Sequence, residues 1–125
     1  MNDKYEFATV AARITELPPK SRPAAKEAAR RAVDADRSLA ACARAVFGVL
    51  IEALYWEKGT TTRIGREDLV LQTKFNRSSV SRALKQLSER GHILIQQTQL
   101  RADYFEKNAY TFPNVAACMH PEEVQ

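Results

Sequence analysis

The chain has 125 residues, a formal net charge of +4 and a hydrophobic content of 45%, which allows one domain with a modest core and some additional helix. This composition excludes a disordered tail, and no apolar run approaches the roughly 20 residues that span a bilayer, so a membrane protein is excluded as well. Because the N-terminus lacks the basic and then apolar design of a secretory signal, and because Cys42 and Cys118 are far apart in sequence, we expect a cytoplasmic protein without a structural disulfide.

Two helices are predicted in the N-terminal segment, residues 1–37. Over residues 3–17 the apolar residues recur at helical spacing, namely Phe7, Val10, Ile14 and Leu17. Pro18 and Pro19 then end the helix. Residues 21–33 have high helix propensity but bury little, because most of them are alanine or charged. One edge of this second helix is basic and is formed by Arg22, Lys26 and Arg30.

A third helix is predicted from Ser38 to Lys58, closed by Gly59. It carries a wide apolar stripe, which makes it the central helix of the core. The stripe consists of Leu39, Cys42, Val46, Val49, Leu50, Ala53 and Leu54, extended sideways by Phe47, Tyr55 and Trp56. Residues 60–64 are predicted to form a turn and a short strand that could pair with a later hairpin.

Residues 64–91 have the pattern of two helices joined by a tight turn. The first stretch, 64–72, is amphipathic and has two acids in its first turn, where they complement the helix dipole. A helix over residues 77–90 follows, with Asn76 as a suitable N-cap and Gly91 as a stop. Its buried face is predicted to contain Val80, Ala83, Leu84 and Leu87. Two helices joined this tightly must cross at a steep angle, which is a helix-turn-helix.

Two strand-like runs come next. Apolar residues alternate in each run, at Ile93 and Ile95 and then at Tyr110 and Phe112. A helix-turn-helix followed directly by such a hairpin, residues 93–112, is a winged helix. We therefore predict a mainly α fold: a winged helix-turn-helix domain over residues 38–112, a two-helix extension before it, and a C-terminal tail over residues 113–125.

The positive charge is concentrated in one part of the chain. Between Arg63 and Gly91 there are seven basic and three acidic residues, so this segment alone carries +4. Such a concentration is what a phosphate-binding surface requires, since each neutralised phosphate releases condensed counterions. A charged face that is simply solvated is the alternative, but charge and motif together favour a nucleic acid as the partner.

The stretch from Ile64 to Ile93 resembles the DNA-reading part of winged helix-turn-helix transcription regulators of the MarR and GntR type. The matching elements are Leu69-Val70, Phe75, the run from Asn76 to Leu84, and Arg90-Gly91-His92-Ile93. The resemblance implies that the residues nearest the bases are Ser78, Ser79, Ser81 and Arg82, and that the wing touches phosphate or the minor groove. The turn departs from the family pattern, which usually has a glycine where this chain has Lys74. A positive φ at that position would strain Lys74.

We therefore expect a sequence-specific protein that binds double-stranded DNA, reading the major groove with the helix 77–90. A transcriptional regulator, most simply a repressor that occupies a promoter, is the leading interpretation. The alternatives are a winged-helix protein of plasmid or phage replication or maintenance and, in another class, a winged-helix protein–protein adaptor. The candidate DNA-binding residues are Lys74, Asn76, Arg77, Ser78, Ser79, Ser81, Arg82 and Lys85, with Arg101 and Lys107 in the wing. The basic helix 22–33 is expected to be solvated, the alternative being that it contacts phosphates beside the recognition helix.

Catalysis is not expected. The two histidines, His92 and His120, belong to no catalytic pattern, and Cys118 with His120 supplies only two ligands, which do not make a metal site. The sequence has no glycine-rich phosphate loop and no segment that resembles an effector-binding domain. We therefore expect no cofactor, no metal and no small-molecule effector.

A homodimer is expected, because one recognition helix spans only a few base pairs and two-fold symmetry doubles the contact. Its seam is predicted between the first and third helices, where a small domain has surplus apolar side chains. These are Tyr5, Phe7, Val10, Ile14 and Leu17, together with Phe47, Tyr55 and Trp56. Removing residues 1–20 would then leave a folded monomer.

Overall fold

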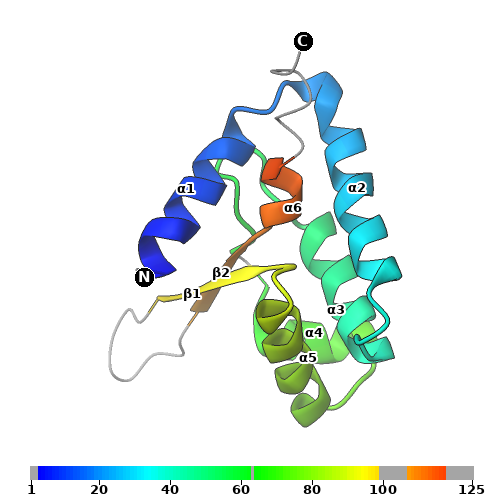
Figure 1. The fold of residues 1–125 in the computed structure, drawn as a ribbon. Coiled ribbons are helices and arrows are strands. Elements are labelled where there is room, and N and C mark those ends of the chain that lie inside the picture. The colour runs from blue at the N-terminus through cyan, green and yellow to red at the C-terminus, as the bar shows by residue number, and fades with distance from the viewer. Residues whose placement is uncertain (1–2, 63, 99–106, 118–125) are drawn as a thin grey trace.

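The computed structural model describes residues 3–62, 64–98 and 107–117. The chain is mainly helical, with a small antiparallel sheet of two strands (Figure 1). In chain order the elements are α1 (Asp3–Thr15), η1 (Pro19–Ser21), α2 (Arg22–Ala35), α3 (Ala41–Glu52), α4 (Arg66–Thr73), α5 (Arg77–Glu89), β1 (Leu94–Thr98), β2 (Lys107–Thr111) and α6 (Pro113–Ala116). No helix within these described ranges is both long enough and apolar enough to cross a bilayer.

The third helix begins later than predicted. Ser38 does not cap it, because the backbone N–H and the hydroxyl of Ser38 both donate to Asp36 Oδ1, at 3.1 and 2.6 Å. Ser38 therefore belongs to a turn closed by an aspartate side chain, and α3 starts after Ala40, which has extended backbone angles.

The third helix also ends earlier than predicted, at Glu52 and not at Lys58. Beyond it the chain folds into a tight turn in which the N–H of Tyr55 donates to Thr60 O at 2.9 Å. Gly59 has a φ of 72°, a left-handed conformation that glycine adopts without steric cost. Gly59 thus serves this turn, and it does not close a helix.

The two strands pair antiparallel, with Leu94 opposite Thr111 and Ile95 opposite Tyr110. Thr61 adds a bridge to the free edge of β2: its N–H donates to Tyr110 O at 2.8 Å, and the Tyr110 N–H donates back to Thr61 O at 2.9 Å. The predicted pairing of the threonine-rich segment with the hairpin is confirmed at this residue.

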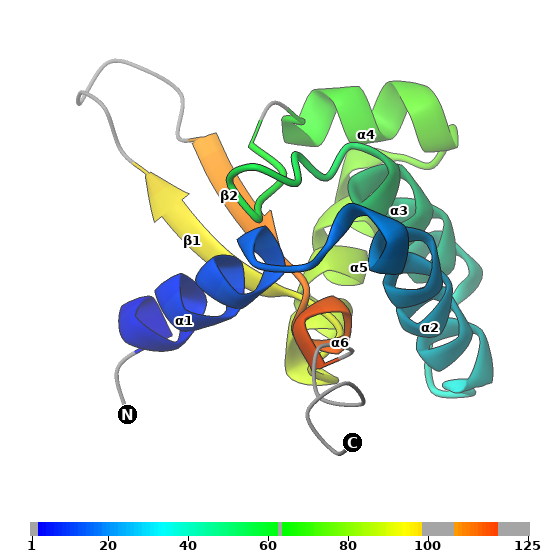
Figure 2. The ribbon, with the colours of Figure 1, turned by 90° about the horizontal axis from the view of Figure 1, so that it is seen from above.

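Helices α4 and α5 are joined by three residues and pack on each other and on α3. Figure 2 shows α3 between α2 and α4, with the β1–β2 hairpin extending away from these three helices and lying alongside α1. The predicted corner is present: Leu69 is completely buried and Phe75 is half-buried against the core. Two helices, a tight turn and a hairpin thus follow one another as the sequence predicted.

The N-terminal helices belong to the same core as the rest of the chain. Phe7, Ile14 and Leu17 of the first segment are 5%, 0% and 2% exposed, and Phe47 of α3 is 1% exposed. The predicted dimer seam is therefore wrong for these residues, because they are already buried within one chain. Tyr5 lies in α1, but its side chain is outside the described residues.

The segment predicted to be a C-terminal tail begins with a helix. Pro113 occupies the first position of α6, where its missing N–H is not needed. Val115 and Ala116 are buried, and α6 packs against both α1 and α2 (Figure 1). The chain after β2 thus helps to attach the two N-terminal helices. Cys118 and His120 lie outside the described residues.

Candidate nucleic-acid interface

The start of α5 is fixed by its N-cap. Asn76 has extended backbone angles, and its side-chain Oδ1 accepts a hydrogen bond from the Ser79 N–H at 2.8 Å. This satisfies one of the free amide groups of the first helical turn. Asn76 was predicted both as the cap and as a candidate DNA contact, and the cap is confirmed. The carbonyl oxygen of its side chain is occupied within the chain.

One face of α5 is buried and the opposite face is exposed. The predicted stripe of Val80, Ala83, Leu84 and Leu87 is buried, with at most 4% of any of these residues exposed. On the other side, Ser78, Arg82 and Lys85 are exposed and Ser81 is half-buried. Spacings of three and four residues bring these four side chains to one ridge, which we call the outer ridge of α5.

The cations of the outer ridge have no partners among the described residues. Neither Arg82 nor Lys85 makes a hydrogen bond or an ion pair with another residue of the described ranges. Arg77 differs, because its Nη1 lies 3.8 Å from Glu67 Oε2 in a contact between two exposed side chains. Exposed pairs of this kind contribute little. The outer ridge therefore presents two uncompensated positive charges and two hydroxyl groups.

The turn before α5 contains the backbone strain that the resemblance implied for Lys74. Lys74 has φ 68° and ψ 13° and is the only non-glycine residue of the described chain with a positive φ. This conformation costs an L-residue other than glycine about 1–2 kcal/mol. The side chain of Lys74 is exposed, so a third cation lies next to the start of α5.

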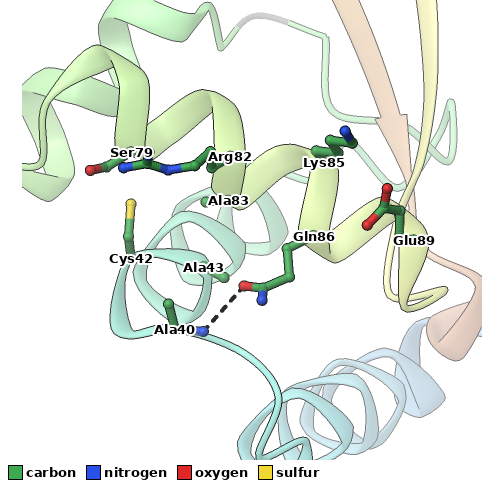
Figure 3. Close-up of a pocket in the computed structure, with 9 residues that line it drawn as sticks. All are labelled: Ala40, Cys42, Ala43, Ser79, Arg82, Ala83, Lys85, Gln86 and Glu89. Carbon is green, nitrogen blue, oxygen red and sulfur yellow. Dashed lines mark hydrogen bonds between the residues drawn. The ribbon is translucent and has the colours of Figure 1, made fainter.

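A groove runs between α5 and the start of α3 (Figure 3). Its volume is about 480 Å³, and Ser79, Arg82 and Lys85 line it from the α5 side. Cys42 is 7% exposed and lies on the α3 side. Burial raises the pKa of its thiol, and the positive charge of Arg82 acts in the opposite direction. Ser79 thus faces this groove and is half-buried, so it is less accessible than Ser78.

Gln86 holds α5 against the connection between α2 and α3. Its Oε1 accepts from the Ala40 N–H at 3.2 Å, the contact drawn in Figure 3, and its Nε2 donates to Ser38 O at 2.9 Å. The amide of Gln86 thereby replaces a capping side chain at the start of α3, which has none of its own. Sequence analysis did not identify this residue, because its partners are 46 and 48 positions away.

A second connection joins the end of α2 to the end of α5 through Asp36. Its Oδ2 accepts from Arg90 Nε at 3.0 Å and lies 2.7 Å from His92 Nε2. A carboxylate can only accept, so Nε2 of His92 carries the proton. The hydrogen bonds from Ser38, His92 and Arg90, in that order, hold the pKa of the Asp36 carboxyl well below its usual range. Arg90 is therefore engaged within the chain.

Replacing Asp36 by asparagine is expected to lower the melting temperature at neutral pH and to weaken the acid dependence of stability. The pKa of Asp36 is depressed in the folded chain, so its contribution is present above the unfolded value of about 3.9 and is lost as pH falls below it. Thermal unfolding between pH 2 and 7 measures both effects. Asp34→Asn is the control, because Asp34 is an exposed neighbour. Equal pH profiles for the two variants would contradict the assignment.

The basic edge of α2 is compensated within the chain. Lys26 Nζ lies 2.9 Å from Glu52 Oε1, and Arg30 forms an ion pair with the same carboxylate. The guanidinium of Arg22 stacks 5.4 Å from the ring centre of Trp56. These contacts support the interpretation of α2 as a solvated helix that covers the body of the chain, rather than as a helix that contacts phosphates.

Arg66, which sequence analysis did not select, lies close to the same surface. It is exposed at the first position of α4 and lines a hollow of about 370 Å³ with Arg77 and Tyr110. Burial raises the pKa of the Tyr110 hydroxyl, and the charge of Arg66 opposes that rise. The signal in the sequence was the position of Arg66 directly after the N-cap Gly65, at the same end of its helix as Arg77 in α5.

The wing residues are only partly placed. Lys107 lies in β2 opposite Thr98, but its side chain is outside the described residues, and so is all of Arg101. Among the described residues, no group of three or more His, Cys, Asp and Glu side chains could hold a metal ion.

Comparisons of the chain with protein-family models, curated proteins and solved structures found no significant match.

Proposed function

We propose that this chain is a winged helix-turn-helix protein that binds double-stranded DNA in a sequence-specific way. The observation that carries the proposal is the outer ridge of α5, where Arg82 and Lys85 are exposed and unpaired beside Ser78 and Ser81. Ion pairs with Glu52 compensate Lys26 and Arg30 of α2, whereas the cations of the outer ridge have no such partner among the described residues and could bind an external anion.

The shape of this region supports the same proposal. An α-helix with its side chains is about 10–12 Å wide, and the major groove of DNA is about 12 Å wide. α5 has one free long side, and a two-stranded hairpin follows it after four residues. Arg82 has the geometry to donate two hydrogen bonds to guanine, and the serine hydroxyls can donate or accept. Lys85 at the end of this ridge and Lys74 just before α5 would contact phosphates.

Regulation of transcription is the function proposed for this binding, most simply repression by occupation of a promoter. The chain is small, and α1, α2 and α6 share one core with α3, α4 and α5. The described residues therefore form a single folded unit. Such a unit would regulate transcription by occupying its site on DNA.

The first test is selection of bound sequences from a random pool of duplex DNA, followed by binding measurements on the selected site. Arg82→Ala is expected to weaken specific binding by about 1–3 kcal/mol and to relax the preference at one base pair, because it removes a contact to a base. Lys85→Ala is expected to weaken binding to all sequences alike and to reduce the salt slope by about one unit, because it removes a phosphate contact.

Lys58→Ala serves as the control, because Lys58 is also exposed but lies in the turn after α3. All three variants should retain the melting temperature of the parent chain within a few degrees, since exposed substitutions change stability by less than about 0.5 kcal/mol. Unchanged affinity and unchanged base preference in Arg82→Ala would contradict the assignment of α5 as the helix that contacts the bases.

A further inference from the structure

One long side of α3 is not covered by any other part of the described chain. Between α2 and α4 it opens into a hollow of about 510 Å³. Residues of α3 form the floor, namely Arg44, Ala45, Gly48, Val49 and Glu52, and the walls are formed by Arg30, Ile64 and Gln72. In the middle of the floor Ala45 and Gly48 are small residues, so the backbone of α3 can be approached closely there from outside. We call this surface the open face of α3.

The glycine at the centre of the open face is not required by the fold. Gly48 lies in the interior of α3, where glycine is less stable than alanine by roughly 0.5–1 kcal/mol. A Cβ atom added to Gly48 would meet no atom within 4 Å. Nothing among the described residues therefore excludes a side chain at this position. A partner that approaches α3 closely would account for a glycine at this position, because the partner would use the space that a side chain would otherwise fill.

The open face continues to the end of α3. A second hollow of about 460 Å³ shares Glu52 and Ala53 with the first and extends to Tyr55 and Thr62. Tyr55 is 52% exposed. From Arg44 to Glu52 the first hollow follows α3 for about 12 Å at a rise of 1.5 Å per residue, and the second hollow continues past the end of the helix to Tyr55. This length suits a second helix that lies along α3.

We propose that the open face of α3 is the contact between two copies of the chain, with the two α3 helices antiparallel and crossing at Gly48. Arg44 precedes Gly48 by four residues and Glu52 follows it by four. A two-fold axis at Gly48 therefore places Arg44 of each copy opposite Glu52 of the other. It also brings the exposed Tyr55 towards the exposed Ala41 of the second copy. The open face of α3 is thus complementary to a second copy of itself, both in charge and in side-chain size, as an isologous interface requires.

The existing contacts of the two charged residues leave room for this pairing. Arg44 donates only to backbone carbonyl groups, those of Asp34 and Asp36, at 3.4 and 2.9 Å. It has no carboxylate partner among the described residues. Glu52 is bound by Lys26 and Arg30 but is still 56% exposed, so its oxygens can accept further hydrogen bonds. The second copy would supply a carboxylate to Arg44 and a third cation to Glu52.

Sedimentation of the full chain without DNA is the first test, so failure of this contact and failure of DNA binding are measured separately. The parent chain is expected to dimerise at concentrations of about 10–100 µM, the range of a modest interface. Gly48→Gln is expected to weaken dimerisation at least about tenfold, because a long side chain separates the two helices at their crossing point. Ala24→Gln places the same side chain on an exposed position of α2 and is expected to leave dimerisation unchanged.

The second test separates a contact from a folding defect by mixing two charge variants. Arg44→Glu alone and Glu52→Arg alone each place like charges opposite one another in a homodimer, so each is expected to be monomeric. In a one-to-one mixture, both cross pairs are again of opposite charge, and a heterodimer is expected. A misfolded variant could not restore association in this way.

A parent chain that stays monomeric at about 100 µM would overturn the proposal and leave the open face to a different partner. The proposal is equally overturned by a dimer that Gly48→Gln leaves intact, since the contact would then lie elsewhere. Charge variants that remain dimeric separately, or that fail to associate when mixed, would exclude the antiparallel pairing.

Discussion

Replacing Gly59 by alanine is expected to unfold the chain at temperatures where the parent is stable, at a cost of more than about 3 kcal/mol. Gly59 has a φ of 72°, and a Cβ atom there would lie 2.1 Å from the carbonyl oxygen of Ala11 and 2.8 Å from its carbonyl carbon. The atoms it meets are backbone atoms of α1, which cannot rotate away. Relief would require α1 to move off the turn, and α1 carries buried core residues. Urea unfolding followed by circular dichroism measures the effect.

Two other glycines provide graded controls for this experiment. Gly91 also has a positive φ, 81°, but a Cβ atom there would meet nothing within 4 Å. Gly91→Ala should therefore cost only the conformational strain, about 1–2 kcal/mol. Gly48→Ala, measured in dilute protein, should stabilise by roughly 0.5–1 kcal/mol, because alanine is the better helix former. If Gly59→Ala and Gly91→Ala cost the same, close packing of α1 on the turn would be disproved.

Removing α1 is expected to unfold the whole chain. Phe7, Ile14 and Leu17 are nearly completely buried, and burial of each contributes about 1.5–3 kcal/mol, or about 5–9 kcal/mol together. That sum is comparable with the entire stability of a small domain, about 5–15 kcal/mol. A chain lacking residues 1–17 should show little helical circular dichroism and no cooperative melting. This outcome is opposite to the folded monomer that the sequence suggested for removal of residues 1–20.

Point variants measure the same effect without truncation. Ile14→Ala should cost about 2–5 kcal/mol, because it leaves a cavity in a site with no exposed surface. Glu16→Ala, two residues later on the exposed side, should change stability by less than about 0.5 kcal/mol. A truncated chain that melts cooperatively near the parent temperature would show that α1 is dispensable for the core.

Periodic patterns predicted the elements around α5 well. The cap at Asn76 and the buried stripe from Val80 to Leu87 are local features, whose cause lies within one or two helical turns. The left-handed backbone of Lys74 was suggested by the resemblance, because the family pattern usually has a glycine at that position. The assignment of the exposed residues to DNA is a different kind of statement and stays a prediction.

What sequence analysis did not find depends on contacts between distant parts of the chain. Asp36 and Gln86 connect residues 46 to 56 positions apart, and neither lies in a periodic pattern. Ser38 was assigned to a helix start, yet its hydroxyl is equally suited to a turn at Asp36. The burial of Phe7 and Phe47 could not be distinguished from a dimer seam, since an apolar stripe does not say which surface covers it. α6 was overlooked because four residues show no period.

Gln86 also gives α5 a connection to the rest of the chain that salt weakens very little. Its two contacts with the α2–α3 connection are hydrogen bonds between neutral groups, which mobile ions screen very little. The attraction between the outer ridge and DNA would be ionic and would fall steeply with ionic strength. Raising the salt concentration would therefore release the DNA while α5 keeps its orientation on α3. The free chain would rebind on dilution without having to rebuild its reading surface.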